Sequence, residues 1–212
     1  EKEVEIKGNI RFNNLSFAYP DEPEKKVLTD VCFEIKEGES VGVIGRTGSG
    51  KTTLVDLLLR IYNVERDMLF IEDVDIMDIQ IKNVRDQIAY VPQDNFLYST
   101  TIRENIAFSS TKITDDEITA SAKLADIYDN VIDFKHGFET FLGERGVTVS
   151  GGQKQRISIA RALAKDAPIL IFDDSVSAVD TNTEDTILNN LNRIRKGKTT
   201  IIIAHRISTV RN

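Results

Sequence analysis

Residues 45–52 of this chain read Gly-Arg-Thr-Gly-Ser-Gly-Lys-Thr. The run matches the pattern G-x-x-x-x-G-K-[ST] at every defined position, and it lies between a buried-strand pattern over residues 40–44 and a helical pattern over residues 52–61. Glycine backbones let successive amides point inward, and the start of the following helix adds positive partial charge. The sequence therefore predicts a polyphosphate-binding loop.

Three side chains have specific expected roles at this loop. Lys51 would lie against the β- and γ-phosphates of a nucleoside triphosphate, and the Thr52 hydroxyl would bind Mg²⁺. Asp173 follows the apolar strand pattern 169–172 and would reach the same Mg²⁺ through its water shell; a solvated acidic turn is the alternative. The residues expected to hold the nucleotide here are Gly45, Arg46, Thr47, Gly48, Ser49, Gly50, Lys51, Thr52 and Thr53.

The rest of the chain predicts an α/β fold. Residues 9–19 and 27–35 alternate as β-strands and predict an antiparallel sheet near the N-terminus. Strand patterns at 169–172 and 199–204 enclose a helical pattern over 183–194, which predicts parallel strands with crossover helices.

Between the two halves of this core, residues 112–165 have a helical pattern. It opens at Thr114 and Glu117, which have the spacing of a capping box. We predict one domain over residues 1–212: a P-loop NTPase core lobe (about 1–92 and 166–212) with an N-terminal antiparallel β subdomain, and a helical insertion subdomain (about 93–165).

Composition excludes several classes of protein. With 212 residues and 41% hydrophobic content, the chain can form one globular core. Its formal net charge of −7 disfavours duplex nucleic acid as a partner. Cys32 is the only cysteine, so no internal disulfide can form and a reducing compartment is expected. Its apolar runs are far shorter than the roughly 20 residues that span a bilayer. Since the chain begins at Glu1 rather than methionine, we expect a fragment of a longer polypeptide.

Residues 149–153, Val-Ser-Gly-Gly-Gln, precede a helical pattern over 154–165. Ser150 can cap that helix, and the paired glycines leave amides exposed at its positive end, which would make a second anion site; an ordinary loop is the alternative. The run resembles the signature sequence of the ATP-binding domains of ABC transporters, with Val149 where leucine is usual. The resemblance covers nearly the whole chain. It implies ATP and Mg²⁺, and a head-to-tail dimer in which ATP lies between one P-loop and the partner's Ser150, Gly151, Gly152 and Gln153.

Four further positions match the family in order. Tyr19 resembles the aromatic residue that stacks on adenine, although it could equally be a sheet-surface residue. Gln93 resembles the glutamine that contacts the metal and the attacking water, and would otherwise belong to a turn. Asp180, in Ser177-Ala178-Val179-Asp180, resembles the loop that meets the partner subunit; a helix start is the alternative. His205 matches the switch histidine that contacts the γ-phosphate, and without the family it would be a surface residue.

The pattern departs from the family at Asp174, where glutamate normally activates the attacking water. A carboxylate one methylene shorter is withdrawn by roughly 1 Å, and such a misplacement can cost about 10²-fold in rate. The resemblance therefore implies an ATPase with slow turnover at its own site. Exporters of two unlike halves often have one such degenerate site, so the expected partner is a second, competent ATP-binding domain.

The resemblance also extends to exporters. Residues 92–96, 101–106 and Gly143-Glu144-Arg145-Gly146 look like exporter segments, which implies a transmembrane partner domain and a position at the cytoplasmic face of the cell membrane. Only seven residues follow His205, whereas the family continues further, so a C-terminal truncation is expected. The alternatives are a soluble ABC ATPase of DNA repair, chromosome architecture or translation, a nucleotide-binding regulatory module without useful turnover, and a P-loop kinase.

Overall fold

The computed structural model describes residues 1–143, 147–174 and 179–205. They form two compact units. The first consists of Glu1–Ile88, Ala167–Ile171 and residues 195–205, and the second of Ala89–Asp166 and Phe172–Ile194. No helix among these residues is long and apolar enough to cross a bilayer.

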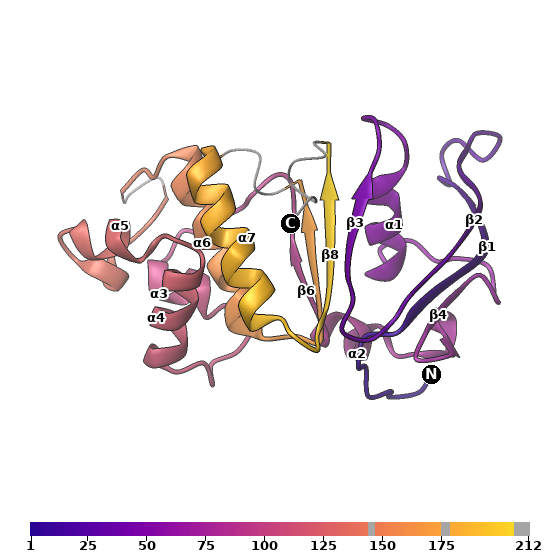
Figure 1. Ribbon diagram of the computed structural model, residues 1–212, viewed down its shortest axis with the longest axis horizontal. Helices are drawn as coiled ribbons and strands as arrows, with labels where there is room; N and C mark the ends of the chain where they lie inside the picture. Colours follow the sequence, from indigo (N-terminus) through magenta and orange to yellow (C-terminus); the bar gives the residue numbers. More distant parts are fainter. Residues whose placement is uncertain (144–146, 175–178, 206–212) are drawn as a thin grey trace. The chain divides into compact units, whose positions relative to one another are not determined.

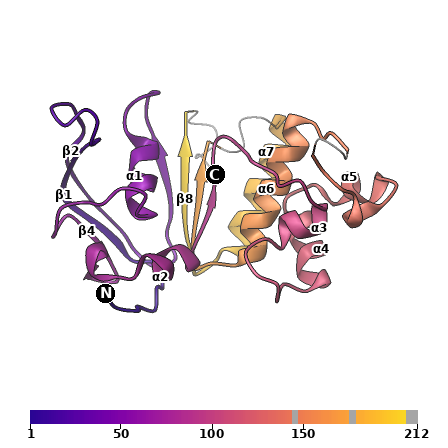
Figure 2. The same cartoon turned by 180° about the vertical axis from the view of Figure 1, so that it is seen from behind.

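The first unit contains the predicted antiparallel sheet, with strand order β2-β1-β4-β5. Strands β1 (Ile10–Ala18) and β2 (Lys26–Ile35) match the predicted strands to within one residue at each end. Both β2 and the short β4 (Leu69–Ile71) pair antiparallel with β1 (Figure 2). Strand β5 (Val74–Asp75) pairs antiparallel with β4. The antiparallel prediction is confirmed, but neither β4 nor β5 was expected from the sequence.

The second sheet has the order β3-β8-β7-β6. Strands β3 (Ser40–Ile44) and β8 (Thr199–Ala204) lie where the sequence predicts strands, and they pair in parallel. Strand β7 (Ile169–Asp173) is buried along its whole length, as its continuous apolar pattern predicts. Strand β6 (Ile88–Val91) was not predicted.

Helix α1 (Lys51–Leu58) packs against β1, β2, β3 and β8 within the first unit. Figure 2 shows α1 between the antiparallel sheet and β8. The apolar side chains that meet around α1 include Phe12, Phe33, Val43, Val55 and Ile203.

Helix α1 is shorter than the predicted helix over residues 52–61. Arg60 adopts a left-handed backbone with φ of 50°, and its buried guanidinium donates to the carbonyl oxygens of Ile76 and Ile79, at 3.3 and 2.7 Å. Ile76 begins a 3₁₀ turn (Ile76–Asp78) and Ile79 follows it; α2 (Ile81–Asp86) comes next. The helix therefore stops where a long-range contact replaces the next helical turn.

The second unit is mainly helical. Helix α6 packs against α3 and α4, and α4 also contacts α5 and α7 (Figure 1). The helices are α3 (Ile102–Ile106), α4 (Asp115–Leu124), α5 (Tyr128–Asp133), α6 (Gly151–Lys165) and α7 (Thr181–Ile194), with a 3₁₀ turn at Gly137–Glu139.

The capping box at Thr114 and Glu117 is present at the start of α4, as predicted. The helical pattern over residues 112–165 is correct for α4, α5 and α6 but wrong for Phe141, which pairs with Thr101 in a β-bridge.

Glu72 fastens the N-terminal segment to the first sheet. Its Oε1 accepts hydrogen bonds from the amides of Lys7, Gly8 and Asn9 at 2.7–2.9 Å, and its Oε2 accepts one from the Asn9 side chain. Partial burial of Glu72 raises the pKa of its carboxyl group, but the hydrogen bonds from Asn9, Gly8 and Lys7 outweigh it, so the pKa lies below its ordinary value.

A depressed folded-state pKa stabilises the fold above the unfolded pKa of about 4.3 and loses this effect as the pH falls through the folded value. We therefore expect Glu72→Gln to lower the melting temperature at pH 7 by roughly 2–4 °C. The variant should also lose less stability than the wild type on further acidification. Thermal unfolding between pH 7 and pH 3 measures both effects. Asp73→Asn is the control, because Asp73 is exposed and makes only a 3.7 Å ion pair with Arg11. Equal pH dependence in wild type and Glu72→Gln would contradict the expectation.

Candidate nucleotide-binding site

The loop before α1 encloses the ammonium group of Lys51. This side chain is 7% exposed, and its Nζ donates to the carbonyl oxygens of Gly45 and Arg46, both at 2.7 Å, and to the Ser49 hydroxyl at 3.3 Å. A buried cation at the start of a helix is a favourable place for a phosphate oxygen. The Lys51 ammonium would contact such a phosphate by exchanging one carbonyl for the anion.

Two glycines of the loop cannot be replaced without displacing a neighbour. A Cβ on Gly45 would lie 2.6 Å from the Ser49 hydroxyl oxygen, and one on Gly50 would lie 2.7 Å from a methyl group of Leu28. Gly50 is also the N-cap of α1, with φ of 86°, so no side-chain oxygen of the cap residue occupies the first amides of the helix. The loop thus has the close backbone path and the exposed helix start that a polyphosphate requires.

Tyr19 lies beside this loop in the first unit. Its hydroxyl forms a hydrogen bond of 2.8 Å with the hydroxyl of buried Thr53, in the first turn of α1. Its ring makes edge contacts with Phe17 and Tyr62, at 5.3 and 5.1 Å between centroids.

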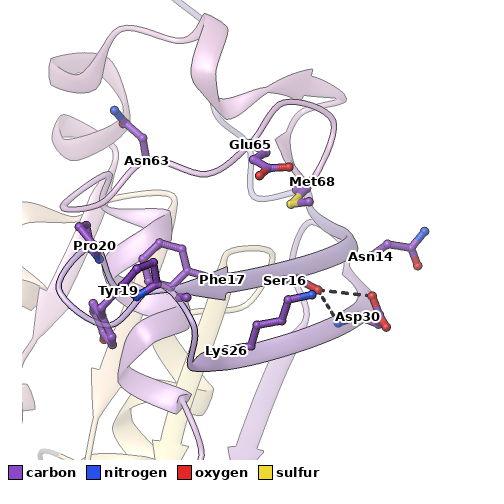
Figure 3. A pocket seen from close by; sticks show the side chains of 12 residues that line it. Asn14, Ser16, Phe17, Tyr19, Pro20, Lys26, Asp30, Asn63, Glu65 and Met68 are labelled. Atoms are coloured by element: carbon purple, nitrogen blue, oxygen red, sulfur yellow. Dashed lines mark hydrogen bonds between the residues drawn. The ribbon is translucent and has the colours of Figure 1, made fainter.

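Beyond these rings, a hollow of about 580 Å³ opens between the β1–β2 hairpin and the chain around Glu65 (Figure 3). Its volume is in the range of small-molecule sites, and Tyr19 and Phe17 supply the aromatic part of its wall.

Asp173 ends β7 with its side chain 2% exposed, and its carboxylate accepts a hydrogen bond of 3.3 Å from the Tyr90 hydroxyl. Tyr90 belongs to β6, three residues before Gln93. The next residue, Asp174, has φ of 48°, a left-handed conformation that aspartate tolerates better than most residues. Gln93 is exposed two residues beyond the end of β6.

The start of α6 confirms the predicted cap. The Ser150 hydroxyl accepts from the Gln153 amide at 3.1 Å, and the Gln153 side chain accepts from the Ser150 amide at 3.0 Å. A Cβ on Gly151 would meet nothing within 4 Å, so the first turn of α6 is open at that position. This capping box fixes where the signature helix begins.

Two further predicted residues lie at element ends. The Asp180 carboxylate accepts from the amides of Asn182 and Thr183 and from the Thr183 hydroxyl, which makes it a cap of α7. The hydrogen bonds from the Thr183 side chain and amide lower the pKa of Asp180. His205 is exposed directly after β8. Ser177, Ala178, and residues 144–146 of the exporter-like loop lie outside the described residues.

The predicted residues thus belong to both units. The P-loop, Tyr19 and His205 lie in the first, whereas Gln93, Asp173, Asp174, residues 150–153 and Asp180 lie in the second. Among the residues that the structure describes, no three His, Cys, Asp or Glu side chains gather as a metal site. A hydroxyl and a single carboxylate are suited to Mg²⁺, which keeps much of its water and binds phosphate oxygens.

Tyr62 and Tyr90 were missed from the sequence. Each is a tyrosine close to an apolar run, and neither has a spacing that distinguishes it from a packing residue. Their roles arise from contacts with Tyr19 and Asp173, which lie 43 and 83 positions away in the chain.

Comparison with known proteins gives a consistent result. The family model described as ABC transporter matches residues 28–177. An ATP-dependent lipid A-core flippase of Syntrophus aciditrophicus is 44% identical over 207 residues, which are 98% of this chain and 34% of that protein. ATP-binding cassette sub-family B member 5 of Mus musculus is 44% identical over 206 residues, 97% of this chain and 16% of that protein.

A solved structure shares the fold. The structure of a bacterial Atm1-family ABC exporter with ATP bound superposes with a TM-score of 0.91 at 38% identity, covering 96% of this chain and 36% of that one. This chain therefore spans about a third or less of the length of these three relatives. The family model covers well over half of the chain, the fold agrees, and the P-loop and capped signature helix occupy the expected elements, so the chain belongs to the ABC transporter family as an ATPase domain.

Proposed function

We propose that this chain is the nucleotide-binding domain of an ABC exporter. It binds ATP and Mg²⁺, pairs head to tail with a second such domain, and drives export through a transmembrane domain at the cytoplasmic face of the membrane. The buried Lys51 ammonium at the open start of α1 is the observation that carries this proposal. The relatives named as a flippase and as an Atm1-family exporter support the direction of transport.

Each predicted site residue has a role in this proposal. The amides of the loop over residues 45–53 and the Lys51 ammonium hold the phosphates, while Tyr19 stacks on the adenine. Thr52, Gln93 and Asp173 hold Mg²⁺, which neutralises phosphate charge when bound. Asp174 and Gln93 orient the attacking water, and His205 contacts the γ-phosphate. The first 92 residues and those from 166 onward form the core lobe of the proposed domain.

The second anion site belongs to the partner's nucleotide. The capped start of α6, with Ser150, Gly151, Gly152 and Gln153, presents the positive end of a 15-residue helix, and Asp180 lies beside the partner's loop in this proposal. We further propose that the natural partner is an unlike half. Asp174 weakens hydrolysis at this chain's own P-loop, and the nearly intact signature serves the partner's competent site.

Complementation between two defective chains tests the head-to-tail pairing. Lys51→Ala removes the cation of the P-loop, and Ser150→Arg blocks the start of α6. In a head-to-tail dimer, mixing the two variants creates one site with both parts intact. We expect ATP-dependent dimers, measured by light scattering, from the mixture but from neither variant alone. A mixture no better than its components would refute head-to-tail pairing between copies of this chain.

A nucleotide-binding regulatory module with no useful turnover is the second candidate, and Asp174 is the observation that favours it. Phosphate release separates the two. An exporter domain releases phosphate when it is combined with a partner half, whereas a regulatory module binds ATP without releasing phosphate under the same conditions.

A further inference from the structure

Arg161 joins the signature helix to the segment that follows Gln93. Its Nη1 donates to the carbonyl oxygen of Phe96 at 2.9 Å, and its Nε donates to the carbonyl oxygen of Asn105 at 2.8 Å. Its Nη2 donates to the Asn105 side-chain oxygen, also at 2.8 Å. One guanidinium therefore fixes two segments that are distant from it in the sequence.

Asn105 completes the connection. Its side chain is fully buried; it donates to the carbonyl oxygens of Tyr98 and Thr101, both at 3.0 Å, and accepts from the Tyr98 amide at 2.9 Å. Residues 96–98 are thus held at Phe96 by Arg161 and at Tyr98 by Asn105. The pair defines the path of the backbone directly after Gln93.

Carbonyl oxygens and aromatic rings surround the positive charge of Arg161. Within the described part of the chain, no carboxylate lies at ion-pair distance from Arg161. Its guanidinium lies 5.2 Å from the ring centre of Tyr98 and 5.9 Å from that of Phe108, and these two rings stack at 4.1 Å. Burial lowers the pKa of Arg161, yet a guanidinium stays charged in proteins. Carbonyl dipoles and ring faces therefore balance this cation, and a lysine could not reproduce the planar fork of donors.

We propose that Arg161 is a positioning residue for ATP hydrolysis, which keeps the segment after Gln93 in register with the signature helix. This inference rests on the proposed function. Gln93 lies three residues before Phe96, and Arg161 lies in the same continuous helix as the cap at Ser150. The distance along α6 from Ser150 to Arg161 is about 16 Å at 1.5 Å per residue. A rigid helix transmits a displacement at Arg161 to the open end of α6, so Gln93 and the second anion site shift together.

The test uses the complete exporter that contains this chain and the variant Arg161→Lys. Because the P-loop and Tyr19 are unchanged, we expect the KM for ATP to stay within about twofold while kcat falls about tenfold or more, as a misplacement near 1 Å can do. Arg103→Lys is the matched control. Arg103 lies in α3 of the same unit and bonds to Asp115 and Glu139 rather than to residues 96–98 or Asn105. We expect Arg103→Lys to keep most of its kcat even though its melting temperature falls about as much as that of Arg161→Lys.

Chemical rescue adds a second readout. In Arg161→Ala, millimolar guanidinium should restore kcat, whereas methylammonium should not. The proposal is overturned if Arg161→Lys loses no more kcat than Arg103→Lys, if KM rises in place of the loss in kcat, or if neither Arg161 variant folds, since the residue would then only support the fold. A wild-type exporter that does not hydrolyse ATP would instead refute the proposed function.

Discussion

Lys51→Ala should reduce the affinity for ATP by about 100-fold or more, equivalent to about 2.7 kcal/mol. The reason is that the phosphates lose the buried ammonium group at the start of α1, and charge-assisted hydrogen bonds are the strongest that such a site offers. Isothermal titration calorimetry with ATP and Mg²⁺ measures the loss directly.

Two comparisons make the Lys51 result specific. The substitution also removes hydrogen bonds to the carbonyl oxygens of Gly45 and Arg46, so thermal unfolding must show that the variant is folded at the titration temperature. Lys82→Ala is the control for loss of a positive charge, because Lys82 is an exposed residue of α2 paired with Asp86. An unchanged ATP affinity in folded Lys51→Ala would be incompatible with the P-loop as the phosphate site.

Asp174→Glu is expected to have the second largest effect, an increase in the rate of ATP hydrolysis of about 10- to 100-fold. Glutamate extends the carboxylate by one methylene toward the attacking water, and ATP affinity should change little because the phosphates are held elsewhere. Phosphate release at saturating ATP, with and without a partner half, measures the gain.

The backbone conformation at Asp174 makes the substitution to glutamate destabilising. With φ of 48°, the position favours aspartate over glutamate, so we expect Asp174→Glu to lose at most about 1–2 kcal/mol of stability. Asp174→Asn is the matched control. It keeps the length of aspartate without its charge and should be slower than the wild type. A wild type as fast as Asp174→Glu would show that aspartate is sufficient here, and the proposal of a degenerate half would fail.

Much of the fold could be predicted because the signals are local. The glycine pattern of residues 45–52 requires particular backbone torsions within eight residues, and Thr114 and Ser150 cap their helices through partners three residues away. The strands at 40–44 and 199–204 are readable as short apolar runs for the same reason.

The candidate site was predictable only in part. Sequence patterns alone predict Lys51 as the phosphate cation and Ser150 as a cap, and the family resemblance supplies the expected roles of Tyr19, Gln93 and His205. Neither the patterns nor the resemblance indicates the hydrogen bond between the Tyr19 and Thr53 hydroxyls or the one from Tyr90 to Asp173, because these partners are separated by 34 and 83 positions.

Local hydrogen bonds and side-chain periodicity involve residues that are close together in the sequence. The sequence alone therefore predicts the P-loop, the helix caps and the strand patterns. The placement of β8 between β3 and β7, the end of α1 at Arg60 and the contacts of Arg161 required the folded chain. In each of these cases the decisive hydrogen bonds join groups that are far apart in sequence, backbone to backbone between β3 and β8 and side chain to backbone at Arg60 and Arg161, and only tertiary packing brings these partners within reach.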